Sequence, residues 1–330
     1  MPHRRLTKGP SKGWLAGVIA WTIAGQLGVA SQTLQNPQSV LIIKQERHLG
    51  EGAALSADGA TMVYVGAGNA LHILKIDSRE DHVLLKGASP GIDVFSNPSF
   101  SPDGMRVAFS ASGGTWYYAS EIYSVRTDGT DLRRLTVSRP STNGHPPFSE
   151  YFYAPIYSPD GSQILMWRDD PSSPQPSSAE LMSSDGSRRI RVADGRPLFW
   201  STTGSAIFVA QGERDQDGRG TTVVRVDLVT GTSQPVFRLN EPIFGKLSEE
   251  EVFAVADDSK VGFATVQAAS ASAPAPSPFQ VRKPSDGTPA PGRLRELKLV
   301  SMRFDRADER VLLYYKSGVE ETFEVFKISK

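Results

Sequence analysis

Short apolar runs alternate with polar turns along most of this chain, and one turn recurs. The stretch "SFSPDGMRVAFS" at residues 99 to 110 is followed by a near copy, "IYSPDGSQILMW", at residues 156 to 167. In "SPDG" the proline presets φ at the first central position, the aspartate tolerates the second, and the glycine adopts the left-handed conformation. Both stretches therefore predict a β-hairpin of two mostly apolar strands.

Looser copies bring the number of these hairpins to six. They begin at Leu55, Phe100, Tyr157, Trp200, Val255 and Phe304. Their turns end at Gly59, Gly104, Gly161, Gly204, Ser259 and Asp308, which gives intervals of 45, 57, 43, 55 and 49 residues. A multi-strand repeat of this length indicates the blades of a β-propeller.

A second hairpin follows the first in five of the six units. These hairpins begin at Leu71, Ile122, Leu181, Val223 and Phe279, and the last of them is expected to run to Leu299. The strand after each first turn is apolar on both faces, as a strand held between two neighbouring sheets must be. Each of these five units then supplies four strands, the number expected of a propeller blade.

The sixth unit is one strand short, because "RVLLYY" and "TFEVFKIS" bring the sequence to Lys330. The segment "SVLIIKQERH", from Ser39, has the composition of a strand and no partner in its own unit. We expect it to pair with the last unit and close the ring, which removes open sheet edges. The alternative is that it packs elsewhere. The predicted fold is all-β, a six-bladed β-propeller over residues 39 to 330 with an N-terminal strand closing the last blade.

The first thirty residues differ from the rest and have the layout of a secretory signal peptide. Arg4, Arg5, Lys8 and Lys12 precede the apolar run "WLAGVIAWTIAGQLGVA", which ends in small residues at Ala30. We expect cleavage there, a short linker over residues 31 to 38, and a periplasmic or secreted protein without a stable membrane span. The alternative is an uncleaved inner-membrane anchor, for which 17 residues are a short span.

Charge and cysteine content narrow the choice of partners and cofactors. The 36 lysines and arginines balance the 36 aspartates and glutamates, so no net field attracts nucleic acid. The absence of cysteine excludes disulfides and cysteine-ligated metals. We expect a monomer that has no nucleic-acid partner and no cofactor.

The repeat "NPSFSPDGMRVAF" followed by "EIYSVRTDGTDLRRLT" closely resembles that of the TolB-like six-bladed β-propellers, also called WD40-like PD40 repeats. The resemblance covers roughly residues 39 to 330 and is most specific in the second and third units. It implies an envelope protein that binds short peptide segments of partner proteins at the propeller channel. Similar repeats occur in the propellers of prolyl-oligopeptidase-like enzymes and in some polysaccharide lyases, so the fold alone does not assign chemistry.

Two aromatic insertions are the strongest candidates for a binding surface, because loops on a rigid scaffold often carry function and aromatic side chains anchor interfaces. They are "GGTWYYAS" and the long connection from residue 138 to 153. The candidate contact residues are Trp116, Tyr117, Tyr118, His145, Phe148, Tyr151 and Tyr153. The alternative is that these aromatics only cap the channel mouth. The inner-strand residues Asn97, Ala154 and Arg196 are expected to approach the central funnel.

Candidate catalytic and metal motifs are incomplete. "GASPG" resembles a nucleophile elbow at Ser89, but Pro90 has no amide hydrogen for an oxyanion hole. Glu213, Asp215 and Asp217 match the first half of a calcium loop, and the position of its bidentate carboxylate is occupied by Val224. We therefore expect no catalytic residues and regard these three acids as a weak calcium candidate in a charged hairpin tip.

These observations favour an exported, non-catalytic module that binds a protein or an extended peptide at the propeller channel and loop face, in the cell envelope. Concave sites with a few polar groups are where such ligands lodge. The alternative is a secreted propeller-fold enzyme, a lyase or hydrolase acting on polysaccharide. That enzyme would need acid or base residues converging on the channel.

Overall fold

The computed structural model describes the propeller part of the chain with gaps between its stretches. The described residues are 38–46, 50–87, 92–113, 120–139, 150–171, 173–174, 176–201, 203–211, 222–238, 251–257, 260–266, 279–282, 298–304, 310–317 and 319–327. The predicted signal peptide, residues 1 to 30, lies outside these ranges. Within them, no helix combines the length and the apolar character needed to cross a membrane.

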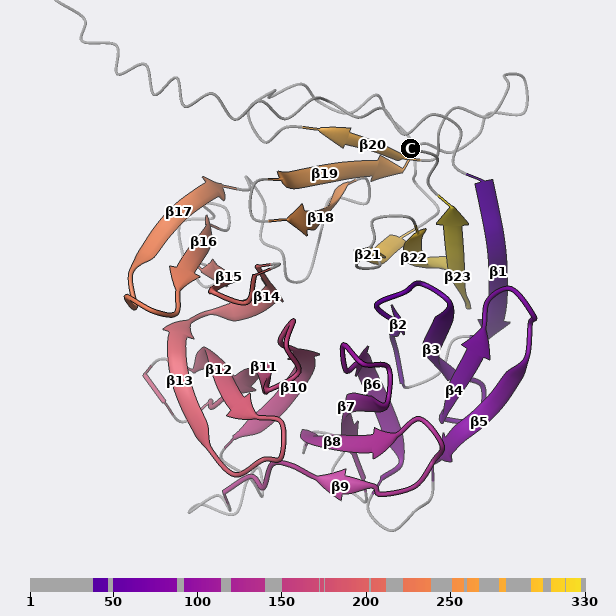
Figure 1. Ribbon diagram of the computed structural model, residues 1–330, viewed down its shortest axis with the longest axis horizontal. Coiled ribbons are helices and arrows are strands. Elements are labelled where there is room, and N and C mark those ends of the chain that lie inside the picture. Colours follow the sequence, from indigo (N-terminus) through magenta and orange to yellow (C-terminus); the bar gives the residue numbers. More distant parts are fainter. Residues whose placement is uncertain are drawn as a thin grey trace, which may run out of the picture.

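The described residues form 23 strands in six antiparallel sheets, which are arranged as a ring (Figure 1). Blade 1 contains β2 (Ala53–Leu55), β3 (Thr61–Gly66), β4 (Ala70–Lys75) and β5 (Asp81–Lys86). Blade 2 contains β6 (Val94–Phe100), β7 (Arg106–Ser112), β8 (Ser120–Arg126) and β9 (Arg133–Arg134). Blade 3 contains β10 (Tyr151–Tyr157), β11 (Gln163–Asp169), β12 (Ser177–Ser183) and β13 (Arg189–Asp194).

The remaining three blades complete the ring. Blade 4 contains β14 (Arg196–Trp200), β15 (Ala206–Gln211), β16 (Thr222–Asp227) and β17 (Ser233–Arg238). Blade 5 has three strands among the described residues, β18 (Glu251–Asp257), β19 (Lys260–Val266) and β20 (Phe279–Arg282). Blade 6 contains β21 (Lys298–Phe304), β22 (Arg310–Ser317), β23 (Glu320–Lys327) and the N-terminal β1 (Gln38–Glu46). The innermost strands of the six blades are β2, β6, β10, β14, β18 and β21 (Figure 1).

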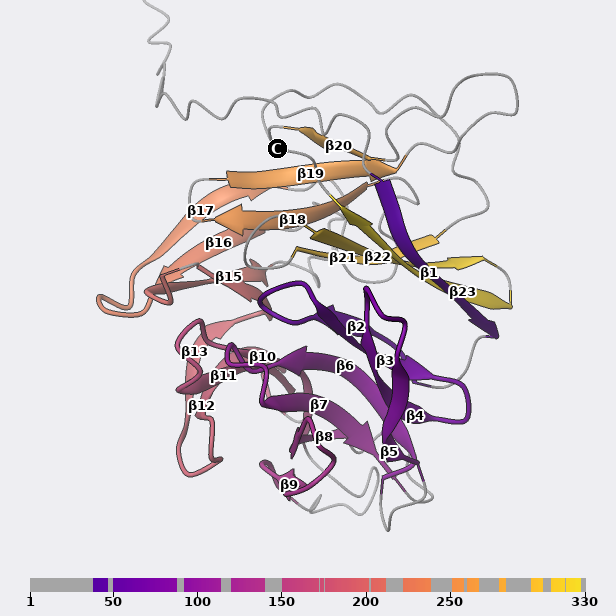
Figure 2. The same cartoon turned by 45° about the vertical axis from the view of Figure 1, so that its right-hand side comes forward.

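The predicted closure of the ring by an N-terminal strand is confirmed. β1 pairs antiparallel with β23, and Leu41 lies opposite Val325. Both views show β1 running along β23 (Figure 1, Figure 2). The Gln45 amide donates hydrogen bonds to the Val65 carbonyl at 2.8 Å and to the Glu321 carboxylate at 2.7 Å. The closing strand therefore connects blade 6 to blade 1.

The recurring turn has one hydrogen-bond pattern in the first three blades. The serine hydroxyl donates to the aspartate at 2.5 to 2.6 Å and accepts the backbone amide five residues further on at 2.9 Å. The glycine has a φ of 67° to 77° in the first four blades, the left-handed conformation predicted from the sequence. The turn therefore satisfies its own polar atoms and is the structural basis of the repeat.

These turns predict a pH dependence of stability. In each, the serine hydroxyl and a backbone amide hold the pKa of the aspartate below its usual value. A folded-state pKa below the unfolded one stabilises the protein above the unfolded value, and this stabilisation disappears as the pH falls through the folded value. We expect the urea midpoint to drop below about pH 4, and to drop less in the triple variant Asp58→Asn, Asp103→Asn, Asp160→Asn. Equal slopes in both proteins would contradict this.

Apolar side chains fill the spaces between neighbouring blades. Separate clusters join blade 6 to blade 1, blade 1 to blade 2, blade 2 to blade 3, and blade 3 to blade 4. The inner strands also carry β-bulges, and in two of them the bulged residues Asn97 and Ala154 have φ values of 50° and 51°. The Asn97 backbone N–H donates a hydrogen bond to the Glu51 carbonyl at 2.9 Å. The Ala154 backbone N–H donates one to the Ser110 hydroxyl, also at 2.9 Å. The bulges thus turn backbone donors toward the preceding blade.

One predicted boundary is wrong. The second hairpin of the fifth unit was expected to extend to Leu299, but Lys298 and Leu299 begin β21, the inner strand of blade 6. They pair with Lys316 and Tyr315 of β22. Apolar periodicity does not distinguish the outer strand of one blade from the inner strand of the next.

Candidate functional site

Several of the predicted site residues lie outside the described ranges. They are Trp116, Tyr117, Tyr118, His145, Phe148, Ser89, Glu213, Asp215 and Asp217. The contact-surface prediction and the calcium candidate at these positions stay predictions. The structure describes the other five predicted site residues, which are Asn97, Tyr151, Tyr153, Ala154 and Arg196.

The structure brings three of these residues together where blades 3 and 4 meet. Tyr151 and Tyr153 lie on the same face of β10 with ring centroids 6.5 Å apart. Tyr153 is opposite Trp167 of β11 in the strand register, and their ring centroids are 5.2 Å apart. The guanidinium carbon of Arg196, the first residue of β14, lies 5.3 Å from the Trp167 ring centroid. We call these four residues the aromatic cluster.

The aromatic cluster contains both buried and partly exposed side chains. Tyr151 is buried, whereas Tyr153, Trp167 and Arg196 are half-buried. Burial raises the pKa of Tyr153 to about 12, with smaller contributions from Asp169 and Tyr151, so its hydroxyl stays protonated at neutral pH. The cluster therefore presents three neutral aromatic rings and one permanent cation.

Asn97 and Ala154 occupy equivalent bulges in consecutive blades but have different surroundings. Ala154 follows Tyr153 directly and so adjoins the aromatic cluster. Asn97 lies next to blade 1, where its backbone N–H donates a hydrogen bond to the Glu51 carbonyl. Trp167 was not predicted, because its place in an apolar strand resembles that of a core residue, and its proximity to Arg196 depends on two separate blades.

A buried ionic network lies on the other side of blade 3, toward blade 2. Arg168 donates to Glu150 at 2.7 Å and also contacts Asp170. Glu180 lies 3.6 Å from Arg168 and 3.1 Å from Arg189. The carboxylates of Glu150, Asp170 and Glu180 have side-chain exposures of 1%, 5% and 7%.

Three arginines balance these three acids. Arg139 binds Glu150 at 3.1 Å and Asp170 at 3.1 Å, and it thereby completes the set with Arg168 and Arg189. Burial opposes ionisation of Glu150, but the hydrogen bonds from Arg168 and Arg139 hold its pKa below the usual value. Burial raises the pKa of Glu180 despite the two neighbouring arginines. This network was not predicted from the sequence, because its members are spread from Arg139 to Arg189 and no motif joins them.

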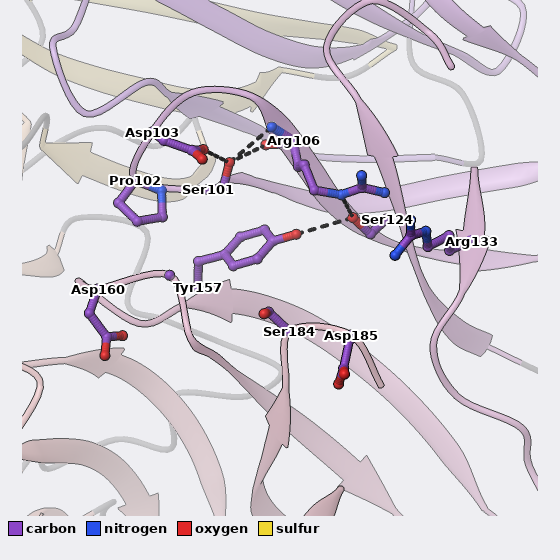
Figure 3. Close-up of a pocket in the computed structure, with 11 residues that line it drawn as sticks. Ser101, Pro102, Asp103, Arg106, Ser124, Arg133, Tyr157, Asp160, Ser184 and Asp185 are labelled. Atoms are coloured by element: carbon purple, nitrogen blue, oxygen red, sulfur yellow. Dashed lines mark hydrogen bonds between the residues drawn. The ribbon is translucent and has the colours of Figure 1, made fainter. Parts of the chain in front are cut away.

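A polar cavity of about 300 Å³ lies between blades 2 and 3, at the end of the blades that carries the recurring turns. Figure 3 shows its lining, in which Tyr157 and Ser124 face each other and Asp103, Asp160 and Asp185 lie at loops. Since β10 runs from the aromatic cluster to Tyr157, the cavity is at the opposite end of blade 3. Two of the carboxylates that line the cavity, Asp103 and Asp160, belong to the recurring SPDG turn. From the sequence, this turn was predicted to have only a structural role.

The described part of the chain contains no group of three or more histidine, cysteine, aspartate or glutamate residues placed to hold a metal ion. His72 stacks on Tyr64 with ring centroids 5.0 Å apart, and its Nδ1 lies 3.3 Å from Asp81. Its contacts are therefore those of a residue packed within blade 1.

Fold and site together define a six-bladed β-propeller with an aromatic cluster at one end and a polar cavity at the other. No protein-family model matches the chain. Among solved structures it is similar to an oligogalacturonate lyase in complex with manganese, with 14% identity, 86% of this chain and 79% of the lyase covered, and a TM-score of 0.52. It is also similar to a puromycin-hydrolyzing peptidase from Mycobacterium tuberculosis, with 16% identity, 81% and 40% coverage, and a TM-score of 0.50.

TolB from Acinetobacter baumannii is another similar structure, with 18% identity and a TM-score of 0.45. The match covers 85% of this chain but 55% of the TolB chain, so this chain spans about half the length of that protein. At these identities the similarity concerns the fold. The activities of these whole proteins do not transfer to this chain with the fold.

Proposed function

We propose that this protein is an exported, non-catalytic binding module that recognises an extended segment of a protein partner at the loop face of blades 3 and 4. The observation that carries the proposal is the packing of Arg196 over Trp167, beside Tyr153 and Tyr151. Tyrosine, tryptophan and arginine are the residue types that most often supply binding energy at protein interfaces.

The geometry suits a peptide in extended conformation. Tyr153 and Trp167 are half-buried, so they keep accessible ring surface while their neighbours hold their orientation. The Arg196 guanidinium carbon lies over the Trp167 ring at 5.3 Å, and an arginine beside aromatic rings is a frequent anchor for a partner chain. The proposed contact surface also includes the predicted loop residues Trp116, Tyr117, Tyr118, His145 and Phe148.

The proposal places the protein in the cell envelope. Residues 1 to 30 have the sequence layout of a signal peptide, and residues 31 to 38 would link the cleavage site to the propeller. Mass spectrometry of the chain recovered from a periplasmic fraction tests this directly. An N-terminus at Ser31 is expected, and an intact Met1 in the membrane fraction would contradict it.

Peptide selection tests the binding function. A displayed library of unstructured peptides is selected against the immobilised protein, and the affinity of the enriched sequences is measured in solution. Trp167→Ala and Arg196→Ala are each expected to weaken binding about 30-fold, since interface anchors contribute about 2 kcal/mol. Arg225→Ala is the matched control, because Arg225 is in the same blade and pairs with Asp227 at 3.4 Å.

Two results would overturn the proposal. One is equal loss of affinity in the Arg225→Ala control and the two cluster variants. The other is turnover of a polysaccharide by the purified protein, which would favour the enzymatic alternative.

A further inference from the structure

The ionic network and the aromatic cluster lie on opposite faces of the same two strands, β10 and β11. Successive side chains of a strand point to opposite faces of the sheet. Tyr151 and Tyr153 belong to the aromatic cluster, whereas Phe152 between them packs in the apolar core toward blade 2. In β11, Trp167 belongs to the cluster and the next residue, Arg168, to the network. The register places Arg168 opposite Phe152, so a shift of either strand moves the network and the cluster together.

The two tyrosines of the cluster lie on a short piece of the β10–β11 ladder. β10 begins at Tyr151, and the register shifts between Tyr153 and Ile156 at the bulge that contains Ala154. Three residue pairs therefore lie between the start of the strand and the bulge. A bulge interrupts the ladder, and the ends of strands open more easily than their centres. This end of β10 consequently depends on side-chain contacts to keep its position.

The ionic network supplies those contacts. Glu150, the residue before β10, is 1% exposed, and its carboxylate accepts hydrogen bonds from Arg168 at 2.7 Å and from Arg139 at 3.1 Å. The guanidinium carbon of Arg189 lies 4.4 Å from the Phe152 ring centroid on the same face. Arg168 therefore connects the end of β11 to the start of β10 directly, through one buried hydrogen bond.

We propose that Arg168 is a positioning residue for the aromatic cluster. Through Glu150 it holds the start of β10 so that Tyr151 and Tyr153 lie beside Trp167 in the arrangement that contacts the partner segment. The planar guanidinium can bind several carboxylates at fixed angles, whereas a lysine ammonium acts as a point charge. The inference rests on the proposed function for its purpose, and its geometric part can be measured without a partner.

The tryptophan indole N–H signals of the free, full-length protein test the geometry by NMR. They are assigned with Trp167→Phe and Trp200→Phe. Trp200 is the internal reference, because its indole N–H donates to the Ile156 carbonyl at 3.0 Å, beyond the bulge. Arg168→Lys is expected to shift or broaden the Trp167 signal and to leave that of Trp200 unchanged. An unmoved Trp167 signal, or equal movement of both signals, would overturn the inference.

Arg310→Lys is the matched control for the loss of a guanidinium. Arg310 is 16% exposed, against 12% for Arg168, and it binds Asp77 at 3.0 Å where blade 6 meets blade 1. The variant is expected to leave the Trp167 signal unchanged. An equal shift in this variant would show that Trp167 responds to any loss of a buried arginine, which would contradict the role of Arg168.

A second variant covers the case in which Arg168→Lys does not fold. Arg139 contacts Glu150 from the outside of the network and is 62% exposed, so Arg139→Ala removes little buried structure. The variant is expected to move the Trp167 signal in the same direction as Arg168→Lys and by a smaller amount. A Trp167 signal identical to that of the wild type would count against the inference.

Peptide affinity separates this inference from the proposed function. Arg168→Lys is expected to weaken binding of the selected peptides about fivefold, because coupling within a contact network is smaller than the loss of an anchor. A shifted Trp167 signal with unchanged affinity would overturn the inference, since the position of the cluster would then not affect binding. Absence of binding by the wild type would overturn the proposed function alone, and the Trp167 signal then decides whether Arg168 positions the cluster.

Discussion

Deletion of residues 38–46 is expected to abolish the folded monomer. The deletion removes β1, which pairs with β23 over eight residue pairs, and so exposes the full length of a new sheet edge. It also removes Leu41, which is 4% exposed in the core between blades 6 and 1, and Gln45, which connects those blades. Loss of a buried leucine alone costs about 2 to 5 kcal/mol, a large part of the stability of an ordinary domain. Size-exclusion chromatography and circular dichroism would detect aggregated or unfolded protein.

A rearranged chain separates loss of this strand from a general effect of shortening. Gln38 lies opposite Lys327 in the register, so the start of β1 is next to the end of β23. Moving residues 38–46 to follow Lys327 through a short Gly-Asn turn is expected to restore the monomer, because the strand returns to the same edge as a hairpin. Recovery of a stable monomer by the simple deletion would contradict the role assigned to β1.

Replacement of Arg168 by methionine is expected to destabilise the protein by about 3 to 5 kcal/mol. Arg168 is 12% exposed and contacts Glu150, Asp170 and Glu180, all of which are buried. The variant leaves three carboxylates with too few cations in a region that excludes water. Removal of one partner from a buried ionic group costs more than the group contributes, since the remaining charges keep their desolvation penalty. Urea unfolding monitored by tryptophan fluorescence measures the change.

The control is an exposed ion pair. Lys75 and Glu80 are 2.6 Å apart with side-chain exposures of 62% and 63%, so Lys75→Met is expected to lower the urea midpoint much less than Arg168→Met does. Similar costs for the two variants would show that the network at blade 3 is effectively solvated. Lowering the pH should reduce the difference between wild type and Arg168→Met, because burial raises the pKa of Glu180 and its protonation removes part of the unbalanced charge.

The propeller ring could be predicted from the sequence, because the features that indicate it are either local or repeated along the chain. The SPDG turn contains its own hydrogen-bond partners within five residues, and its recurrence counts the blades. The closing strand was predicted by elimination, since the segment from Ser39 had no partner in its own unit. The strand boundary at Lys298 was predicted wrongly, because apolar periodicity is the same for the outer strand of one blade and the inner strand of the next.

The sites were predictable only in part, since they form between blades. Tyr151 and Tyr153 were selected for their aromatic loop and Arg196 for its place before a turn, yet their meeting through Trp167 depends on how blades 3 and 4 pack. The ionic network joins residues from Arg139 to Arg189, and no spacing rule connects them. The polar cavity is lined by two copies of the SPDG turn, one from blade 2 and one from blade 3. Their proximity depends on how the two blades pack and is not visible in the sequence.

The pairing of β1 with β23 also sets an order in time. Gln45 and Glu321 are 276 positions apart, and ribosomes add about 5 to 20 residues per second. The synthesis of β1 therefore precedes that of its partner strand by about 14 to 55 seconds. During synthesis the apolar sequence "VLII" therefore has no partner strand until β23 has been made.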